Sequence, residues 1–137
     1  MEPLIIEATK ETPEIILDPE KELFRIKGVS HPENIKTFFA PVFHWLDNYF
    51  AENKEKQGTK MVFQFFYIYI NSSSLKHLYD LFKKLTDFRD NGIFVEIVWN
   101  YADDDEDMLE SGEELSELKN VNLPFRYLAY TEKHDLG

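Results

Sequence analysis

The alternation of hydrophobic and polar positions predicts strands near the start of the chain. Short apolar runs at residues 4–6 and 15–17 are typical of strands or extended arms. Hydrophobic positions alternate again after a turn-forming Asp-Pro-Glu-Lys segment. We therefore expect a β-hairpin over residues 15–27, with its turn at residues 18–21 and with Gly28 ending its second strand.

A long amphipathic helix is predicted to follow the hairpin. Ser30 and Glu33 have the spacing of a capping box, in which the serine side chain caps the first turn. Apolar side chains then recur every three or four residues through about residue 52, which places them on one face of a helix. These positions are Ile35, Phe38, Phe39, Val42, Leu46, Tyr49 and Phe50.

The second half of the chain alternates strands with helices. Residues 61–70 are apolar or aromatic except for Gln64, which predicts a central strand covered on both faces. A helix follows, then a strand over residues 93–99, a short helix over residues 106–119 and a last strand over residues 125–130. This order predicts an α/β fold in which helices pack on a single-layer mixed β-sheet.

Composition and charge narrow the range of functions. No internal repeat or long linker divides the chain, so we expect one domain over residues 1–137. The formal net charge of −11 opposes binding to nucleic acids and to anionic membranes. No segment approaches the roughly 20 consecutive apolar residues that a membrane helix needs. The absence of cysteine excludes thiolate metal sites and cysteine nucleophiles, and it suits a cytoplasmic protein.

The segment Asn71-Ser72-Ser73-Ser74 joins the strand at residues 61–70 to the next helix. Ser72 or Ser73 is expected to cap this helix, because serine is a favoured N-cap. A helix N-terminus also carries free amide hydrogens and about half a positive charge, so it accepts a phosphate well. The junction lies at the carboxyl end of a central strand, where α/β sheets place their sites. The residues alone leave two interpretations open, a plain helix cap and a phosphate site.

A family resemblance is carried by short segments spread over nearly the whole chain. They are residues 7–13 (EATKETP), 30–34 (SHPEN), 41–46 (PVFHWL), 69–74 (YINSSS) and 103–110 (DDDEDMLE). Taken together and in this order, they resemble the SiaC family of bacterial regulatory phosphoproteins. The resemblance implies a fold like that of the STAS-type anti-sigma-factor antagonists.

The resemblance also implies a switch operated by phosphorylation. In that family the hydroxyl residue directly after the asparagine of this junction is the phosphoacceptor; it is often threonine, and here it is Ser72. A cognate protein kinase and a PP2C-like phosphatase are implied as partners. In the best-known branch, the unphosphorylated protein binds and activates a diguanylate cyclase, which raises cyclic-di-GMP and favours biofilm. We expect the partner to dock on a surface made by Asn71, Ser72, Ser73, Ser74 and Lys76.

We expect no catalytic residue, no cofactor and no bound metal. Residues 103–107 together with Glu114 have the carboxylate spacing of an EF-hand, but Met108 stands where its sharp turn needs glycine. No nucleophile elbow, P-loop or dinucleotide fingerprint occurs in the sequence. The alternative to a regulatory protein is a small α/β enzyme, or an anion- or ligand-binding domain, that uses the helix N-terminus at residues 72–74.

Overall fold

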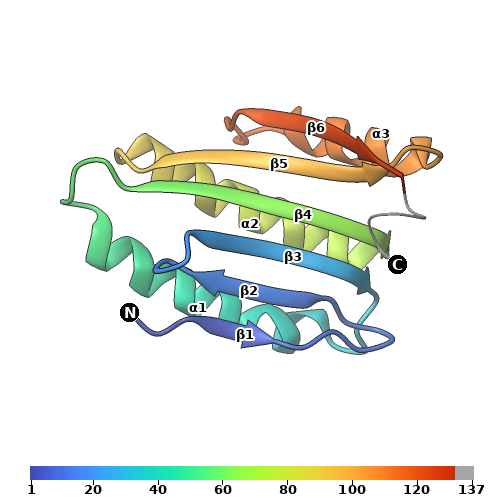
Figure 1. Cartoon of the computed structure of the whole chain (residues 1–137), viewed down its shortest axis with the longest axis horizontal. Coiled ribbons are helices and arrows are strands. Elements are labelled where there is room, and N and C mark those ends of the chain that lie inside the picture. Colours follow the sequence, from blue (N-terminus) through green and yellow to red (C-terminus); the bar gives the residue numbers. More distant parts are fainter. Residues whose placement is uncertain (132–137) are drawn as a thin grey trace.

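The computed structural model describes residues 1–131, which form three helices and six strands (Figure 1). In chain order these are β1 (Leu4–Ile6), β2 (Glu14–Asp18), β3 (Leu23–Ser30), α1 (Ile35–Asn53), β4 (Lys60–Ile70), α2 (Ser72–Asp90), β5 (Phe94–Ala102), α3 (Glu106–Ser116) and β6 (Phe125–Tyr130). The predicted order of elements is confirmed. No helix in this part of the chain is long and apolar enough to cross a membrane.

The strands form one mixed sheet in the order β1-β2-β3-β4-β5-β6. The pairs β1–β2 and β2–β3 are antiparallel, whereas β3, β4, β5 and β6 run parallel to one another. One helix crosses over between each parallel pair. Because such crossovers are right-handed and the strand order never reverses, all three helices lie on the same face of the sheet (Figure 1). The predicted single-layer mixed sheet with helices packed on it is confirmed.

The alternating side chains of β4 show that helices cover one face of the sheet and leave the other open. Met61, Phe63 and Phe65 are fully buried beneath the helices. Val62 and Gln64, which alternate with them along the strand, remain partly exposed. The expectation that this strand is covered on both faces is therefore wrong. Apart from Gln64, its outward positions are apolar too, and a run without clear alternation looks the same whether one face or two are covered.

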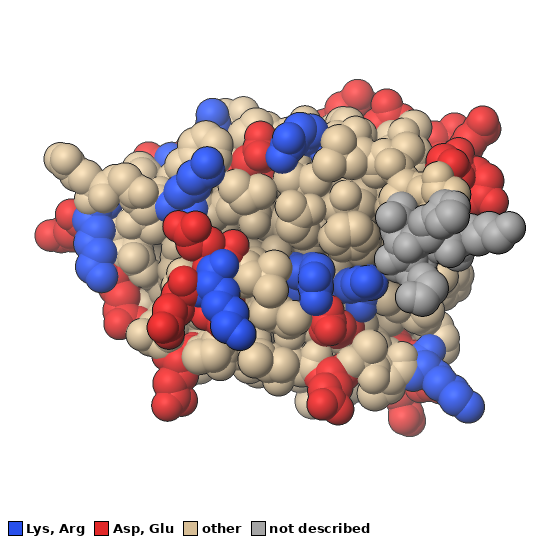
Figure 2. All heavy atoms as spheres, in the orientation of Figure 1, with Lys and Arg blue, Asp and Glu red and all other residues tan. Residues whose placement is uncertain are grey.

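On the open face, charged side chains of both signs lie among uncharged ones (Figure 2). The ring of Phe66 lies 6.0 Å from the ring of Tyr130 and 5.7 Å from the ammonium group of Lys27. Arg25 forms an ion pair with Glu14 at 3.0 Å across β2 and β3. These contacts give the apolar side chains partial cover without a second layer of helices.

The end of β3 differs from the prediction. Gly28 has a φ of +126°, which favours glycine, and the pairing register shifts there, yet the strand continues to Ser30. Ser30 pairs with Ile70 on β4, and its hydroxyl donates a hydrogen bond to the Ser74 hydroxyl at 2.8 Å. Asn34 caps α1 instead. The predicted capping box at Ser30 is therefore wrong, because long-range strand pairing engages this serine.

α3 packs closely on β5 at Gly112. A Cβ atom at this position would lie 2.5 Å from Nε1 of Trp99, which is closer than side chains approach one another. The Trp99 indole also donates a hydrogen bond to the carbonyl of Met108 at 2.9 Å. Glycine weakens a helix, and here it permits the contact that holds α3 against the sheet. The predicted helix is confirmed, although it ends at Ser116 rather than at residue 119.

Candidate functional site

α2 starts immediately after β4, and Asn71 caps it. The Asn71 side-chain oxygen accepts a hydrogen bond from the backbone N–H of Ser74 at 2.8 Å. The expectation that Ser72 or Ser73 is the cap is wrong. Asparagine is as strong an N-cap as serine, and Asn71 has the extended backbone that a cap requires, whereas both serines are already helical.

The three serines of the first turn have different environments. Ser72 is exposed, and its hydroxyl makes no hydrogen bond within the part of the chain that the structure describes. Ser73 is also exposed, and its hydroxyl donates to the Asn71 side chain at 3.2 Å. Ser74 is only 3% exposed, and its hydroxyl donates to the carbonyl of Ser30 at 3.1 Å. A modifying enzyme can therefore reach Ser72 and Ser73 in the folded protein but not Ser74.

The electrostatics of this turn favour an added negative charge. The backbone N–H groups of Ser72 and Ser73 point out of the helix end, and the first turn contains no acidic residue. Lys76 is exposed one turn further along α2 and forms no ion pair within residues 1–131. A phosphate on Ser72 would therefore meet the positive end of the helix dipole and one unpaired ammonium group nearby.

Two aromatic side chains next to this junction were not anticipated. The rings of His31 and Tyr69 pack edge to face with their centroids 5.8 Å apart, and Tyr69 is 51% exposed. They lie beside the site because the N–H of Asn71 donates to the carbonyl of Ser30, the residue before His31, at 3.0 Å. Adjacent strand ends bring these residues together, and no sequence motif joins them.

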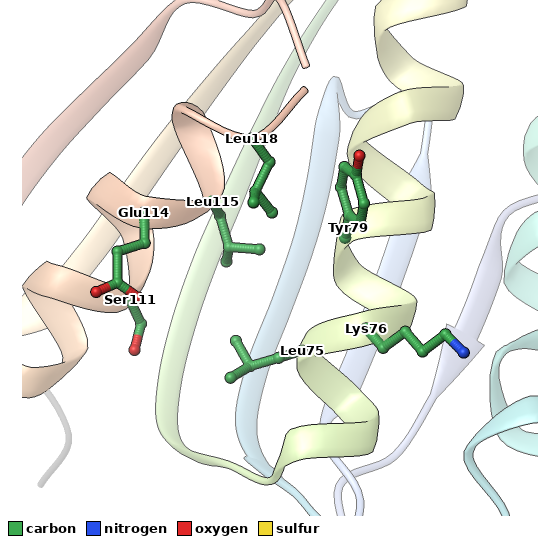
Figure 3. A pocket seen from close by; sticks show the side chains of 7 residues that line it. All are labelled: Leu75, Lys76, Tyr79, Ser111, Glu114, Leu115 and Leu118. Carbon is green, nitrogen blue, oxygen red and sulfur yellow. The ribbon is translucent and has the colours of Figure 1, made fainter. Parts of the chain in front are cut away.

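A groove between α2 and α3 begins one turn after Ser72. It has a volume of about 350 Å³ (Figure 3). Its lining residues are Leu75, Lys76, Tyr79, Ser111, Glu114, Leu115 and Leu118. Of the expected docking residues, the groove therefore includes Lys76, while Asn71 to Ser74 form the turn that precedes it. The spacing of Leu75 and Tyr79 was the available signal for this surface on α2.

The acidic segment after β5 serves as a helix cap. The Asp105 side chain accepts a hydrogen bond from the backbone N–H of Met108 at 3.0 Å. The chain is helical from Glu106 to Ser116, so residues 103–114 do not form the calcium-binding loop of an EF-hand. Among residues 1–131, no group of three or more His, Asp or Glu side chains converges as metal ligands do. That this segment binds no divalent ion tightly stays a prediction.

Comparison with known proteins gives consistent matches. Residues 6–130 match the model of the SiaC family regulatory phosphoproteins. The uncharacterized protein PA14_02130 of Pseudomonas aeruginosa strain UCBPP-PA14 is 28% identical over 132 residues, covering 96% of this chain and 100% of that protein. The crystal structure of apo-SiaC from Pseudomonas aeruginosa matches with a TM-score of 0.81 at 28% identity, over 94% of this chain and 100% of that one.

A further solved structure contains a partner. It is the crystal structure of diguanylate cyclase SiaD in complex with its activator SiaC, from the same bacterium. The match has a TM-score of 0.82 at 28% identity and covers 93% of this chain and 99% of that chain. The similarity to SiaC thus extends over nearly the whole described fold, including the junction at the start of α2.

Proposed function

Because the chain belongs to the SiaC family of regulatory phosphoproteins, we propose that it is a phosphorylation-switched regulator that binds and controls a diguanylate cyclase in its unphosphorylated form. The whole chain acts as one regulatory domain and has no catalytic activity of its own. A cognate kinase adds the phosphate to Ser72, and a PP2C-like phosphatase removes it. The related SiaC, which forms a complex with the cyclase SiaD as its activator, supports this choice of partner.

The observation that carries the proposal is the environment of Ser72. Its hydroxyl is exposed at the first position of α2 and makes no hydrogen bond within the described residues, so it is open to a kinase. Phosphorylation adds about −1.5 to −2 charges. The free amides and the helix dipole stabilise that charge, so the fold persists.

The partner interface responds differently from the fold. The phosphate brings bulk and bound water to a surface that otherwise presents a hydroxyl, and Lys76 alone does not neutralise two charges. A loss of about 3 kcal/mol in binding free energy weakens association more than a hundredfold. Phosphorylation therefore releases the partner while leaving the regulator folded.

The test measures by calorimetry how tightly the full chain binds SiaD from Pseudomonas aeruginosa. Unmodified protein and Ser72→Ala are expected to bind SiaD, and Ser72→Asp to bind more weakly. Phosphoserine installed at position 72 during translation should abolish binding at micromolar concentrations. Ser73→Ala is the matched control, because Ser73 is the other exposed serine of this turn.

Three outcomes would contradict the proposal. One is failure of the unmodified protein to bind SiaD. Another is unchanged affinity with phosphoserine at position 72. The third is turnover of a phosphoester or nucleotide that disappears in Ser72→Ala, which would identify an enzyme using this helix end.

A further inference from the structure

β6 lies at one edge of the sheet, and β1 lies at the other (Figure 1). β1 has only three residues, and such a short edge strand offers little for another chain to pair with. β6 has six residues, among which there is no proline and a single charged side chain, that of Arg126. Its pairing with β5 runs without a bulge. β6 therefore lacks most of the features that keep an edge strand from pairing with another chain.

The backbone groups of β6 point alternately toward β5 and away from the sheet. The carbonyls of Pro124 and Tyr130 accept hydrogen bonds at 2.9 and 2.8 Å from N–H groups of β5 and of the residue that follows β5. In a parallel ladder the residues between these positions alternate in direction. Phe125, Tyr127 and Ala129 therefore direct their N–H and C=O groups away from the sheet, and these groups form no hydrogen bond within residues 1–131.

α3 makes the helix-covered side of this edge acidic. The Tyr127 hydroxyl donates a hydrogen bond to the carbonyl of Gly112 on α3 at 3.5 Å. Burial raises the pKa of this hydroxyl, and the nearby negative charges of Glu113 and Glu117 raise it further. Both carboxylates are exposed, and neither forms an ion pair within residues 1–131. A basic side chain placed next to Tyr127 on this side would therefore meet two unpaired negative charges.

The open side of β6 is different. Leu128 alternates with Tyr127 along the strand, so it lies on the open face, where it is 42% exposed. The charge of Arg126 on this face is paired with Glu96 at 3.5 Å. A strand laid beside β6 would alternate its side chains between the two faces. The edge is therefore complementary to an extended segment in which basic residues face α3 and apolar residues lie next to Leu128.

A second copy of this chain fits the edge poorly. An antiparallel pair of β6 strands related by a two-fold axis would bring Glu113 and Glu117 of both chains to the same side of the joint. The side chains that β6 presents on that side are Phe125, Tyr127 and Ala129, so none is basic. Like charges therefore oppose this pairing, and the net charge of −11 on each copy adds to the repulsion. The charge pattern favours a different, basic chain.

We propose that β6 is a docking strand for an extended segment of a partner protein, in which lysine or arginine alternates with apolar residues. The segment adds to the sheet as a seventh strand. Its backbone pairs with Phe125, Tyr127 and Ala129, and its basic side chains lie beside Glu113 and Glu117. β6 is two strands away from β4, so this surface is distinct from the start of α2. The inference goes beyond the proposed function and can be tested independently of it.

The first experiment titrates the full chain with synthetic peptides and follows its backbone NMR signals. One peptide alternates lysine with valine, a second alternates glutamate with valine, and a third is the lysine peptide with every backbone nitrogen methylated. The lysine peptide should bind at least about fivefold more tightly than the glutamate peptide, because cross-strand pairs of opposite charge are favourable. Its largest shifts should lie in residues 125–130. The methylated peptide should not bind, because it has no N–H to donate to β6.

Two results of this titration would overturn the inference. One is equal binding of the lysine peptide and its methylated form, which would mean that charge alone attracts them. The other is a set of shifts that leaves residues 125–130 unaffected, which would place the peptide elsewhere on the protein.

The second experiment compares two charge reversals at the end of α3. Glu117→Lys changes the charge beside β6, and Glu114→Lys is the matched control, because Glu114 lines the groove toward α2. Glu117→Lys should weaken binding of the lysine peptide at least about threefold, and Glu114→Lys should weaken it less. Equal losses in the two variants would contradict the proposed position of the basic side chains.

A third variant tests the backbone pairing. Ala129→Pro removes an N–H that faces away from β5, so the sheet should keep its thermal midpoint. Binding of the lysine peptide should fall at least about tenfold, because a donor is lost and the proline ring obstructs the edge. Unchanged binding would overturn the inference. Sedimentation decides between occupants: a dimer of the parent that Ala129→Pro abolishes would show that a second copy, and not a basic segment, pairs with β6.

Discussion

Two strand-to-helix junctions of this protein share one capping mechanism and differ in everything around it. α1 follows β3, α2 follows the adjacent parallel strand β4, and an asparagine caps each helix. The Asn34 side chain accepts from the N–H of Thr37 at 3.1 Å, and the Asn71 side chain accepts from the N–H of Ser74 at 2.8 Å. Helix capping at the carboxyl edge of the sheet therefore does not by itself mark a functional site.

The difference lies in the first turn of each helix. α1 begins with the buried Ile35, so its first position offers no hydroxyl to solvent. α2 begins with the exposed Ser72, and its third position, Ser74, is buried in a hydrogen bond to β3. At the second junction the Ser72 hydroxyl is therefore exposed, while the hydrogen bond of Ser74 holds the same turn against β3. The comparison indicates that a modification site needs an accessible group on a turn that tolerates the change.

The largest expected effect tests this anchoring at the third position of each helix. Ser74→Asp should lower the free energy of unfolding by about 3 kcal/mol, because it places a carboxylate where the hydroxyl is buried. Thr37→Asp, at the exposed equivalent in α1, should change stability by less than about 0.5 kcal/mol, since an acid near a helix N-terminus is favourable. Urea denaturation at neutral pH measures both, and similar losses in the two variants would remove the distinction between the turns.

A smaller effect is expected from removing each cap. Asn71→Ala should cost about 1–2 kcal/mol and Asn34→Ala about 0.5 kcal/mol, at the two ends of the range for N-caps. The reason is that the partly buried Asn71 side chain accepts from both Ser74 and Ser73, whereas the exposed Asn34 accepts a single hydrogen bond. Thermal and urea denaturation of both variants provide the comparison. A larger loss for Asn34→Ala would show that α1 depends more on its cap.

The smallest effect concerns a charge at Ser72 itself. Ser72→Asp should raise the free energy of unfolding by about 0.5 kcal/mol through the helix dipole, and Ser72→Asn, which is uncharged, is the matched control. Because exposed charges are screened, the gain should shrink in about 1 M salt. Denaturation of both variants at low and high salt measures this. A destabilised Ser72→Asp would mean that phosphorylation acts by loosening the helix rather than by changing the docking surface.

Much of the fold was predictable from the order of apolar segments. The apolar row from Ile35 to Phe50 and the aromatic run at residues 61–70 predicted α1 and β4, which position both junctions. The helix N-terminus at Ser72 was also predictable, because turn-forming polar residues there separate a strongly apolar strand from a segment with the apolar spacing of an amphipathic helix. The groove was not, since its walls come from helices separated by a whole strand, and neither helix predicts the width of the gap.

Two of the wrong predictions, those for Ser30 and for residues 61–70, share one cause. Ser30 with Glu33 fits a capping box locally, but strand pairing with β4 outweighs that local interaction. The run at residues 61–70 suggested two covered faces, but a strand order that never reverses leaves one face without helices. Local patterns report which conformations a segment favours, whereas burial depends on where the rest of the chain lies.

Ser72, Ser73 and Ser74 show which properties of this site the sequence determined and which the tertiary structure decided. Three identical side chains after an asparagine established a helix start that tolerates negative charge, because capping and the helix dipole are local effects. Which of these serines can be modified was not a local matter. Ser74 is removed from solvent by Ser30, which lies 44 residues earlier on β3, while Ser72 remains exposed. Only the pairing of β3 with β4 brings the two hydroxyls together, so the folded sheet determines which hydroxyl a partner or kinase meets.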